Sequence, residues 1–222
     1  MNPIERRNTA NPVALVRVEG EGIASASKIA GHAAVFYNAA DAGTEYILME
    51  YDGRKIIERI MPGAFDGVLA DDVRCLYDHE TDKLLGRTRS GTARIASDAT
   101  GLGYECDLPE TTLAADLRAL IARGDITGSS FAFTVASDGY HWLTEEARDI
   151  RVITRIERLY DVGPVTYPAY EASTTGLRAS GDLAELRASL EQHRKATASQ
   201  ASEQQAANEA RARRARCVEL GL

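Results

Sequence analysis

Short apolar runs, broken by glycine, aspartate and asparagine, fill the sequence up to about residue 108. In order, these runs read PVALVRV, GHAAVFYN, EYILMEY, VRCLYDH, GTARIA and GLGYECDL. Runs of this kind with turn-forming residues between them are typical of β-strands, and a succession of them predicts a mainly-β domain. A chain of 222 residues with 44% hydrophobic content can bury one sizeable core, so we expect one large domain with an appendage.

One helix is expected within this β-rich pattern, in the segment LAADLRALIARG. Its large apolar residues recur at helical spacing, at Leu113, Leu117, Leu120 and Ile121. Thr111 and Thr112 precede the segment as capping residues, and Gly124 follows it as a terminator. The RGD tripeptide at 123–125 is therefore explained as a helix end, in preference to an adhesion motif.

The next stretch, GSSFAFTV, alternates with the period of a β-strand. Ser129 shares one face with the phenylalanines, and Ser130 shares the other with Ala132 and Thr134. We therefore expect Ser129 to lie in the core as a satisfied hydroxyl and Ser130 to face away from it. A further β-branched segment, RVITRIERLYDVGPVTYPAY, is closed by Gly163, Pro164 and Pro168.

Charge and cysteine content limit the partners and the compartment. A net charge of −7 argues against a general nucleic-acid or anionic-membrane surface. The three cysteines, Cys75, Cys106 and Cys217, are odd in number and too widely spaced to suggest a zinc site, so we expect no metal or other cofactor. No apolar stretch has the length of a signal peptide core or a membrane span, which favours the cytoplasm.

The composition changes at about residue 179, to alanine, glutamine, glutamate and arginine. The segment 179–222 is close to neutral and has few large apolar residues after Leu190. Two interpretations remain open: a solvated helix, or an appendage that is removed or becomes ordered on a partner. We therefore divide the chain into a domain at 1–178 and a helical or disordered tail at 179–222.

Nucleophilic catalysis requires a hydroxyl, a base and a group that orients the base. Ser130 is the favoured nucleophile, because small residues surround it and phenylalanines anchor its strand from the other face. Of the four histidines, His193 falls in the polar tail, His141 in an expected loop and His32 at an expected strand edge, whereas His79 ends an apolar strand. Glu157 and Asp161 are the candidate acids, both expected on one face of the RIERLYDV strand.

Five segments together resemble the prohead proteases of tailed bacteriophages, across roughly residues 25–178. They are PGAFD (62–66), LYDHETDKLLGRTRSGT (76–92), DLPETT (107–112), RGDITGSSFAF (123–133) and LYDVGPVTYPAY (159–170). That family is related to the herpesvirus capsid-maturation proteases, whose fold is a mostly antiparallel β-barrel surrounded by helices. The resemblance therefore implies a mainly-β fold with an antiparallel barrel core and flanking helices.

The resemblance also implies a catalytic triad. The family's histidine falls on His79 in DHE, where Asn is commoner than Asp78, and its serine falls on Ser130 in GSSFAF, where Met is commoner than Ser129. The acid position falls on Asp161, which we prefer to Glu157. In the viral relatives this third residue is a histidine, but no histidine occurs in RIERLYDV. By analogy, a loop at 162–163 would supply the oxyanion donors.

The function implied by the resemblance is a serine endopeptidase of procapsid maturation. Such an enzyme is enclosed in the procapsid in the host cytoplasm, cleaves the scaffold or the scaffolding segment of the major capsid protein, and cleaves itself. A homo-oligomer within the procapsid is expected. The polar tail would serve as an encapsidation signal that is later trimmed.

Two alternatives remain beside the protease. The first is a non-catalytic capsid assembly protein of the same fold, for which Ser130→Ala would be silent. The second is a metalloenzyme that uses His79 with Asp78, Glu80 and Asp82. Adjacent residues of an extended segment point to opposite faces, which makes this cluster a poor metal cage.

Overall fold

The computed structural model describes residues 3–9, 12–16, 27–51, 53–167 and 180–219. Its contacts divide the chain into two units, Met1–Arg178 and Ala179–Leu222, which are described separately. The strands are β1 (Glu5–Thr9), β2 (Ala14–Val16), β3 (Lys28–Val35), β4 (Tyr46–Tyr51), β5 (Arg54–Ile60), β6 (Arg74–Leu76), β7 (Leu84–Arg87), β8 (Ala93–Ser97), β9 (Gly101–Asp107), β10 (Gly128–Val135), β11 (Tyr140–Glu145), β12 (Arg148–Ile153) and β13 (Ile156–Val165). The α-helices are α1 (Thr112–Arg123) and α2 (Ser180–Glu219), and short 3₁₀ turns span Ala42–Thr44 and Asp66–Val68.

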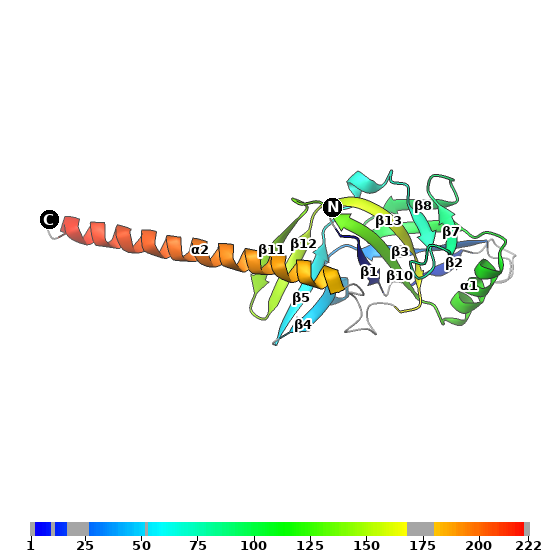
Figure 1. Ribbon diagram of the computed structural model, residues 1–222, viewed down its shortest axis with the longest axis horizontal. Coiled ribbons are helices and arrows are strands. Elements are labelled where there is room, and N and C mark those ends of the chain that lie inside the picture. The colour runs from blue at the N-terminus through cyan, green and yellow to red at the C-terminus, as the bar shows by residue number, and fades with distance from the viewer. Residues whose placement is uncertain (1–2, 10–11, 17–26, 52, 168–179, 220–222) are drawn as a thin grey trace. The chain divides into compact units, whose positions relative to one another are not determined.

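The strands of the first unit form three sheets, with the orders β1-β10-β13-β6-β7, β11-β12-β5-β4 and β2-β3-β9-β8 (Figure 1). Among the described strands, all pairs are antiparallel except β12 with β5 and β13 with β6. The mainly-β class expected from the sequence is confirmed. The ladders form three open sheets, and a closed barrel stays a prediction.

Strand β10 is the centre of the first unit. All eight of its residues are buried, and its Phe131 and Phe133 rings stack with their centroids 4.6 Å apart. Phe65 meets Phe131 edge-on at 5.6 Å, a favoured arrangement for aromatic rings. The alternation seen in the sequence thus places the phenylalanines in the core and leaves Ser130 on the opposite face of the strand.

Helix α1 forms as its caps and apolar spacing predict. The Thr111 side chain accepts a hydrogen bond from the Ala114 amide, and Gly124 ends the helix in a left-handed conformation with φ of 82°. Leu117 and Ile121 are buried on one face. Arg123 is the last helical residue, so the RGD tripeptide is a helix end.

A buried ionic cluster ties β1 to two strands of another sheet. Arg7 donates to Glu58 at 2.7 Å and to Glu5 at 2.6 Å, and Arg151 donates to the same two carboxylates at 3.0 and 2.7 Å. All four side chains are at least nine-tenths buried. Because each charge has opposite charges beside it, the cluster avoids the large penalty of an unpaired buried ion.

The second unit contains helix α2, which is continuous from Ser180 to Glu219 (Figure 1). The sequence was compatible with either a helical or a disordered tail, and in the structure this segment is a helix. Removal of this segment by self-cleavage stays a prediction. No helix in the described part of the chain is long and apolar enough to cross a membrane.

Candidate active site

Ser130 lies in the middle of a sheet, between two neighbouring strands. It faces Asn8 of β1 and Gly163 of β13 in the strand registers. Its side chain points away from the phenylalanine core, and the residue is 1% exposed. Ser129, on the core side, is 3.0 Å from the hydroxyl of Tyr104, so the expected satisfied core hydroxyl is confirmed.

His79 lies in the turn that follows β6 and contacts Ser130. The imidazole Nε2 is 2.6 Å from Ser130 Oγ, and Nδ1 is 2.6 Å from Asp161 Oδ1. The three residues are far apart in sequence, but the fold brings them together. Each ring nitrogen of His79 thus has one side-chain partner, Ser130 at Nε2 and Asp161 at Nδ1. The structure therefore brings together the serine, the histidine and the preferred acid.

Asp161 lies on the face of β13 that carries Ser130 in the neighbouring strand, and the strand becomes irregular between Asp161 and Glu157. The β10–β13 register shifts twice, between Ala132 and Phe133 and between Thr134 and Val135. Asp161 pairs with Ala132, on the face that carries Ser130, and is 7% exposed. Glu157, at the other end of the strand, is exposed. The prediction that both acids share one face ignored these bulges, which break the alternation between them.

A second acceptor lies beside the serine hydroxyl. Ser130 Oγ is 2.8 Å from the backbone oxygen of Arg7 in β1. A hydroxyl has one proton, so it can donate either to Arg7 O or to His79 Nε2. When the ring is neutral and its Nδ1–H donates to Asp161, Nε2 carries no proton and accepts a hydrogen bond from the Ser130 hydroxyl. When the hydroxyl donates to Arg7 instead, Nε2 must carry a proton and donate it to Oγ.

The other histidines have different surroundings. His32 Nε2 is 2.8 Å from Asp98 on an exposed surface, and this hydrogen bond lowers the pKa of the Asp98 carboxyl. His141 lies in β11, so the loop expected there is wrong, and His193 lies in α2. Across the described ranges, no group of three or more His, Cys, Asp or Glu side chains is arranged to hold a metal ion.

The two cysteines whose side chains are described, Cys75 and Cys106, are both buried. A hydrogen bond to Cys106, together with burial, raises the pKa of the Cys75 thiol well above its usual value. A buried thiol with a raised pKa is a poor nucleophile, because the thiolate is the reactive form. Two described hydroxyls have a histidine nitrogen within reach: Ser130 lies 2.6 Å from His79 Nε2, and the exposed Thr197 lies 3.5 Å from His193 Nε2. Of these two histidines, His79 has a carboxylate on its other ring nitrogen.

Residues 162 and 163 do not form the loop that was expected to supply oxyanion donors. Both lie inside β13, with β10 on one side and β6 on the other. Gly163 is needed there by a close approach: a Cβ at this position would lie 1.9 Å from the carbonyl oxygen of Leu76. These two residues therefore lie in a paired strand between β10 and β6, and the prediction of a loop at this position is wrong.

Comparison with known proteins connects this geometry to a family. Residues 15–185 match the family model described as caudovirus prohead serine protease. The chain belongs to this family. A curated relative, the prohead protease of Enterobacteria phage HK97, is 31% identical over 146 residues, which cover 64% of this chain and 55% of the relative. The chain spans about half the length of that relative. No solved structure matches the chain.

Two features of this prohead protease family member were missed by the sequence analysis. The first is strand β1, whose sequence ERRNT is too polar to be recognised as a strand. The second is the environment of Asp78, whose carboxylate accepts hydrogen bonds from the amide and hydroxyl of Thr166. Asp78 and His79 both have a left-handed backbone conformation. The sequence does not indicate this conformation, except that aspartate tolerates it better than most residues.

Proposed function

We propose that Ser130, His79 and Asp161 are the nucleophile, the base and the orienting acid of a serine endopeptidase. The observation that carries this proposal is the chain of two 2.6 Å contacts that runs from Ser130 through His79 to Asp161. This arrangement of side chains suits acyl transfer whatever the fold that carries it.

The proposed reaction begins when neutral His79 takes the Ser130 proton at Nε2 while Oγ attacks a peptide carbonyl carbon. The resulting tetrahedral intermediate collapses as the imidazolium gives its proton to the leaving amine, and an acyl-enzyme forms. Water then attacks the ester carbonyl carbon, losing a proton to Nε2. The second tetrahedral intermediate breaks its bond to Ser130 Oγ, which takes that proton back from the imidazolium, and the product leaves as a carboxylic acid. Asp161 accepts the Nδ1–H throughout, fixing the tautomer and stabilising the imidazolium.

The proposed substrates are the major capsid protein, at its scaffolding segment, or a separate scaffold protein, and the enzyme itself. Family membership supports capsid proteins as substrates, because the family model that matches is described as a prohead serine protease. In this proposal the enzyme acts as a homo-oligomer inside the procapsid, in the host cytoplasm. The polar segment 179–222 is the part that self-cleavage would remove.

Co-expression with the cognate capsid protein tests the proposal. We expect wild type to shorten the capsid protein and itself, and Ser130→Ala and His79→Ala to do neither, while procapsids still assemble; intact mass of all chains is the measurement. Ser129→Ala is the matched control, since it removes the neighbouring hydroxyl from the core face and leaves the triad in place. Shortening that persists in both variants would favour a non-catalytic assembly protein processed by another protease.

A further inference from the structure

The turn that carries His79 is conformationally unfavourable. Asp78 and His79 both adopt the left-handed region, with φ of 55° and 60°, and they are the only non-glycine residues with positive φ in the described part of the chain. Two consecutive L-residues rarely share this conformation, although aspartate tolerates it better than most. The backbone that aims the imidazole at Ser130 therefore needs contacts that hold it in place.

Those contacts are made by Asp78. Its backbone amide donates to the carbonyl oxygen of Pro164 at 3.0 Å. Its carboxylate accepts at Oδ1 from the Thr166 amide, at 2.8 Å, and at Oδ2 from the Thr166 hydroxyl, at 2.7 Å. The Tyr77 hydroxyl is 2.9 Å from Thr166 Oγ1, and because the threonine proton is already given to Asp78, Tyr77 is the donor in that contact.

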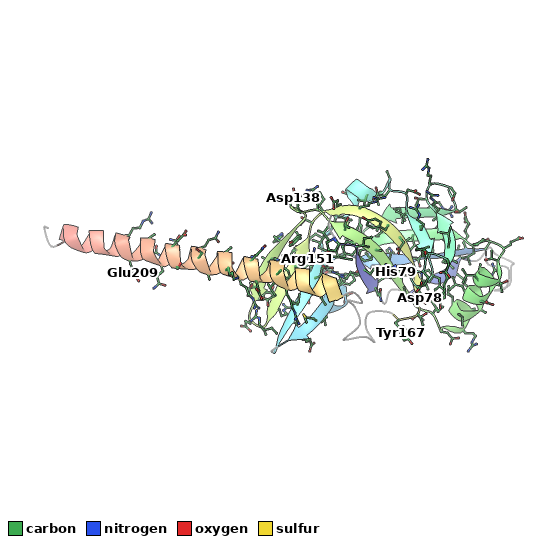
Figure 2. The ribbon with its side chains drawn as sticks, viewed as in Figure 1. Asp78, His79, Asp138, Arg151, Tyr167 and Glu209 are labelled. Carbon is green, nitrogen blue, oxygen red and sulfur yellow. The ribbon has the colours of Figure 1, made fainter. Side chains whose placement is uncertain are left out.

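The anchor and the catalytic acid belong to one stretch of chain. Asp161 and Pro164 lie in β13, and Thr166 follows its last residue. His79 is therefore fixed at two points by the same strand: at Nδ1 by Asp161 and at its backbone through Asp78. Figure 2 shows Asp78 and His79 in the same region of the molecule, with Tyr167, the residue after Thr166, nearby.

We propose that Asp78 is a positioning residue, which holds the strained turn so that His79 Nε2 stays within hydrogen-bond reach of Ser130. Both of its carboxylate oxygens are occupied by Thr166, and it acts through the backbone of His79. A displacement of a catalytic group by about 1 Å can lower a rate by about a hundredfold, so the turn is a sensitive point. This inference rests on the proposed function and adds a residue to it.

Three substitutions of Asp78 separate its contributions. Asp78→Asn tolerates the left-handed conformation, keeps an acceptor for the Thr166 amide, and presents an amide to the Thr166 hydroxyl, which can accept it. Asp78→Gly also permits the conformation but removes both side-chain bonds. Asp78→Ala removes the bonds and disfavours the conformation. Thr166→Val is the matched variant on the other side: it keeps the bond from the Thr166 amide and deletes the bonds that the hydroxyl makes with Asp78 and Tyr77.

The measurement is the rate at which a small fluorophosphonate labels Ser130 in the full-length chain, with Ser130→Ala as the blank. We expect the labelling rate of Asp78→Asn to stay within about threefold of the wild-type rate. Asp78→Gly should be labelled about tenfold more slowly, since it loses hydrogen bonds to a charged group. Alanine should be slower than glycine, and Thr166→Val should fall between Asn and Gly. Rescue by Asn is the result that a merely destabilised fold would not give.

A second readout does not depend on access to the serine. In proton NMR of the chain with ¹⁵N-labelled histidine, the Nδ1–H of His79 should give a downfield signal in wild type and Asp78→Asn, and a weakened or shifted signal in Asp78→Gly. Thermal unfolding of each variant shows whether the chain is folded at the temperature of the assay.

The outcomes distinguish the two proposals. Wild-type labelling rates in Asp78→Gly and Asp78→Ala, with Ser130 still labelled, would overturn the role of Asp78 and leave the triad standing. An Asp78→Asn rate as low as that of alanine would also overturn it, because the charge would then matter and not the anchor. A wild-type chain whose Ser130 is not labelled would overturn the proposed function and the positioning role together.

Discussion

Asp161 contacts His79 through Nδ1, the ring nitrogen that faces away from Ser130. A carboxylate in this place accepts the Nδ1–H, which leaves Nε2 unprotonated toward Ser130. An amide of the same shape would offer an N–H to Nδ1 and favour the opposite tautomer. The role of Asp161 is therefore tested by a change that keeps its size.

We expect Asp161→Asn to lower the rate of capsid-protein cleavage by about 10⁴, the loss typical of an orienting carboxylate replaced by its amide. The rate is followed by mass spectrometry of the substrate over time. Glu157→Gln is the control and should leave the rate unchanged, because Glu157 lies on the exposed end of β13. Equal losses in the two variants would mean that Asp161 is not the orienting acid.

At the scale of elements, β13 organises the site. It supplies Asp161, pairs with the serine strand on one side and with β6 on the other, and approaches β6 closely at Gly163. The turn with His79 starts two residues after β6 ends. A change in the spacing of these two strands would therefore move the histidine relative to the serine.

Gly163→Ala tests that dependence. The added methyl group would overlap the carbonyl oxygen of Leu76, so the β6–β13 pair must separate. We expect a loss of about 1–3 kcal/mol in the free energy of unfolding, as for other overpacked sites, together with loss of cleavage. Gly67→Ala is the control, since a Cβ there meets nothing within 4 Å. Urea denaturation of both variants is the measurement, and a Gly163→Ala chain as stable as wild type would contradict the expected overlap.

Elements with regular apolar patterns were predictable from the sequence, and those with buried charges were not. The capping residues and apolar spacing of α1, and the alternation of β10, predicted the ends of both elements to within a residue or two. Strand β1 was missed because Glu5 and Arg7 are buried in it as ion pairs, whose partners in β5 and β12 the local sequence cannot show. The triad was nominated by motif resemblance, whereas the bulges that separate Glu157 from the face of Asp161 follow from the pairing of two strands.

At the scale of the first unit, the ionic cluster couples stability to pH. Burial raises the pKa of Glu5, but the charges of Arg7 and Arg151 outweigh it and hold the pKa below its ordinary value. A carboxyl group with a lowered pKa in the folded state stabilises that state at pH values above the pKa in the unfolded chain, about 4.3. This stabilisation is lost as the pH falls through the folded-state pKa.

We therefore expect the free energy of unfolding to decrease as the pH is lowered from about 4.3, and Glu5→Gln to make this decrease shallower. At pH 7 the same variant should be destabilised by about 3 kcal/mol, because two buried guanidinium groups then share one carboxylate. Asp98→Asn is the control: its pair with His32 is exposed and should contribute less than about 1 kcal/mol. Guanidinium denaturation from pH 3 to 7 would contradict the assignment if the Glu5→Gln profile ran parallel to that of wild type.

The wide sequence separation of the site residues has a consequence for when the proposed activity can first appear. Ser130 packs against Arg7, 123 residues earlier, while His79 contacts Asp161, 82 residues later. On the ribosome, a nascent chain that already displays the serine and the histidine still has neither Asp161 nor Thr166, whose amide and hydroxyl bond Asp78. Under the proposed function, peptide-bond cleavage therefore begins only after synthesis has passed β13.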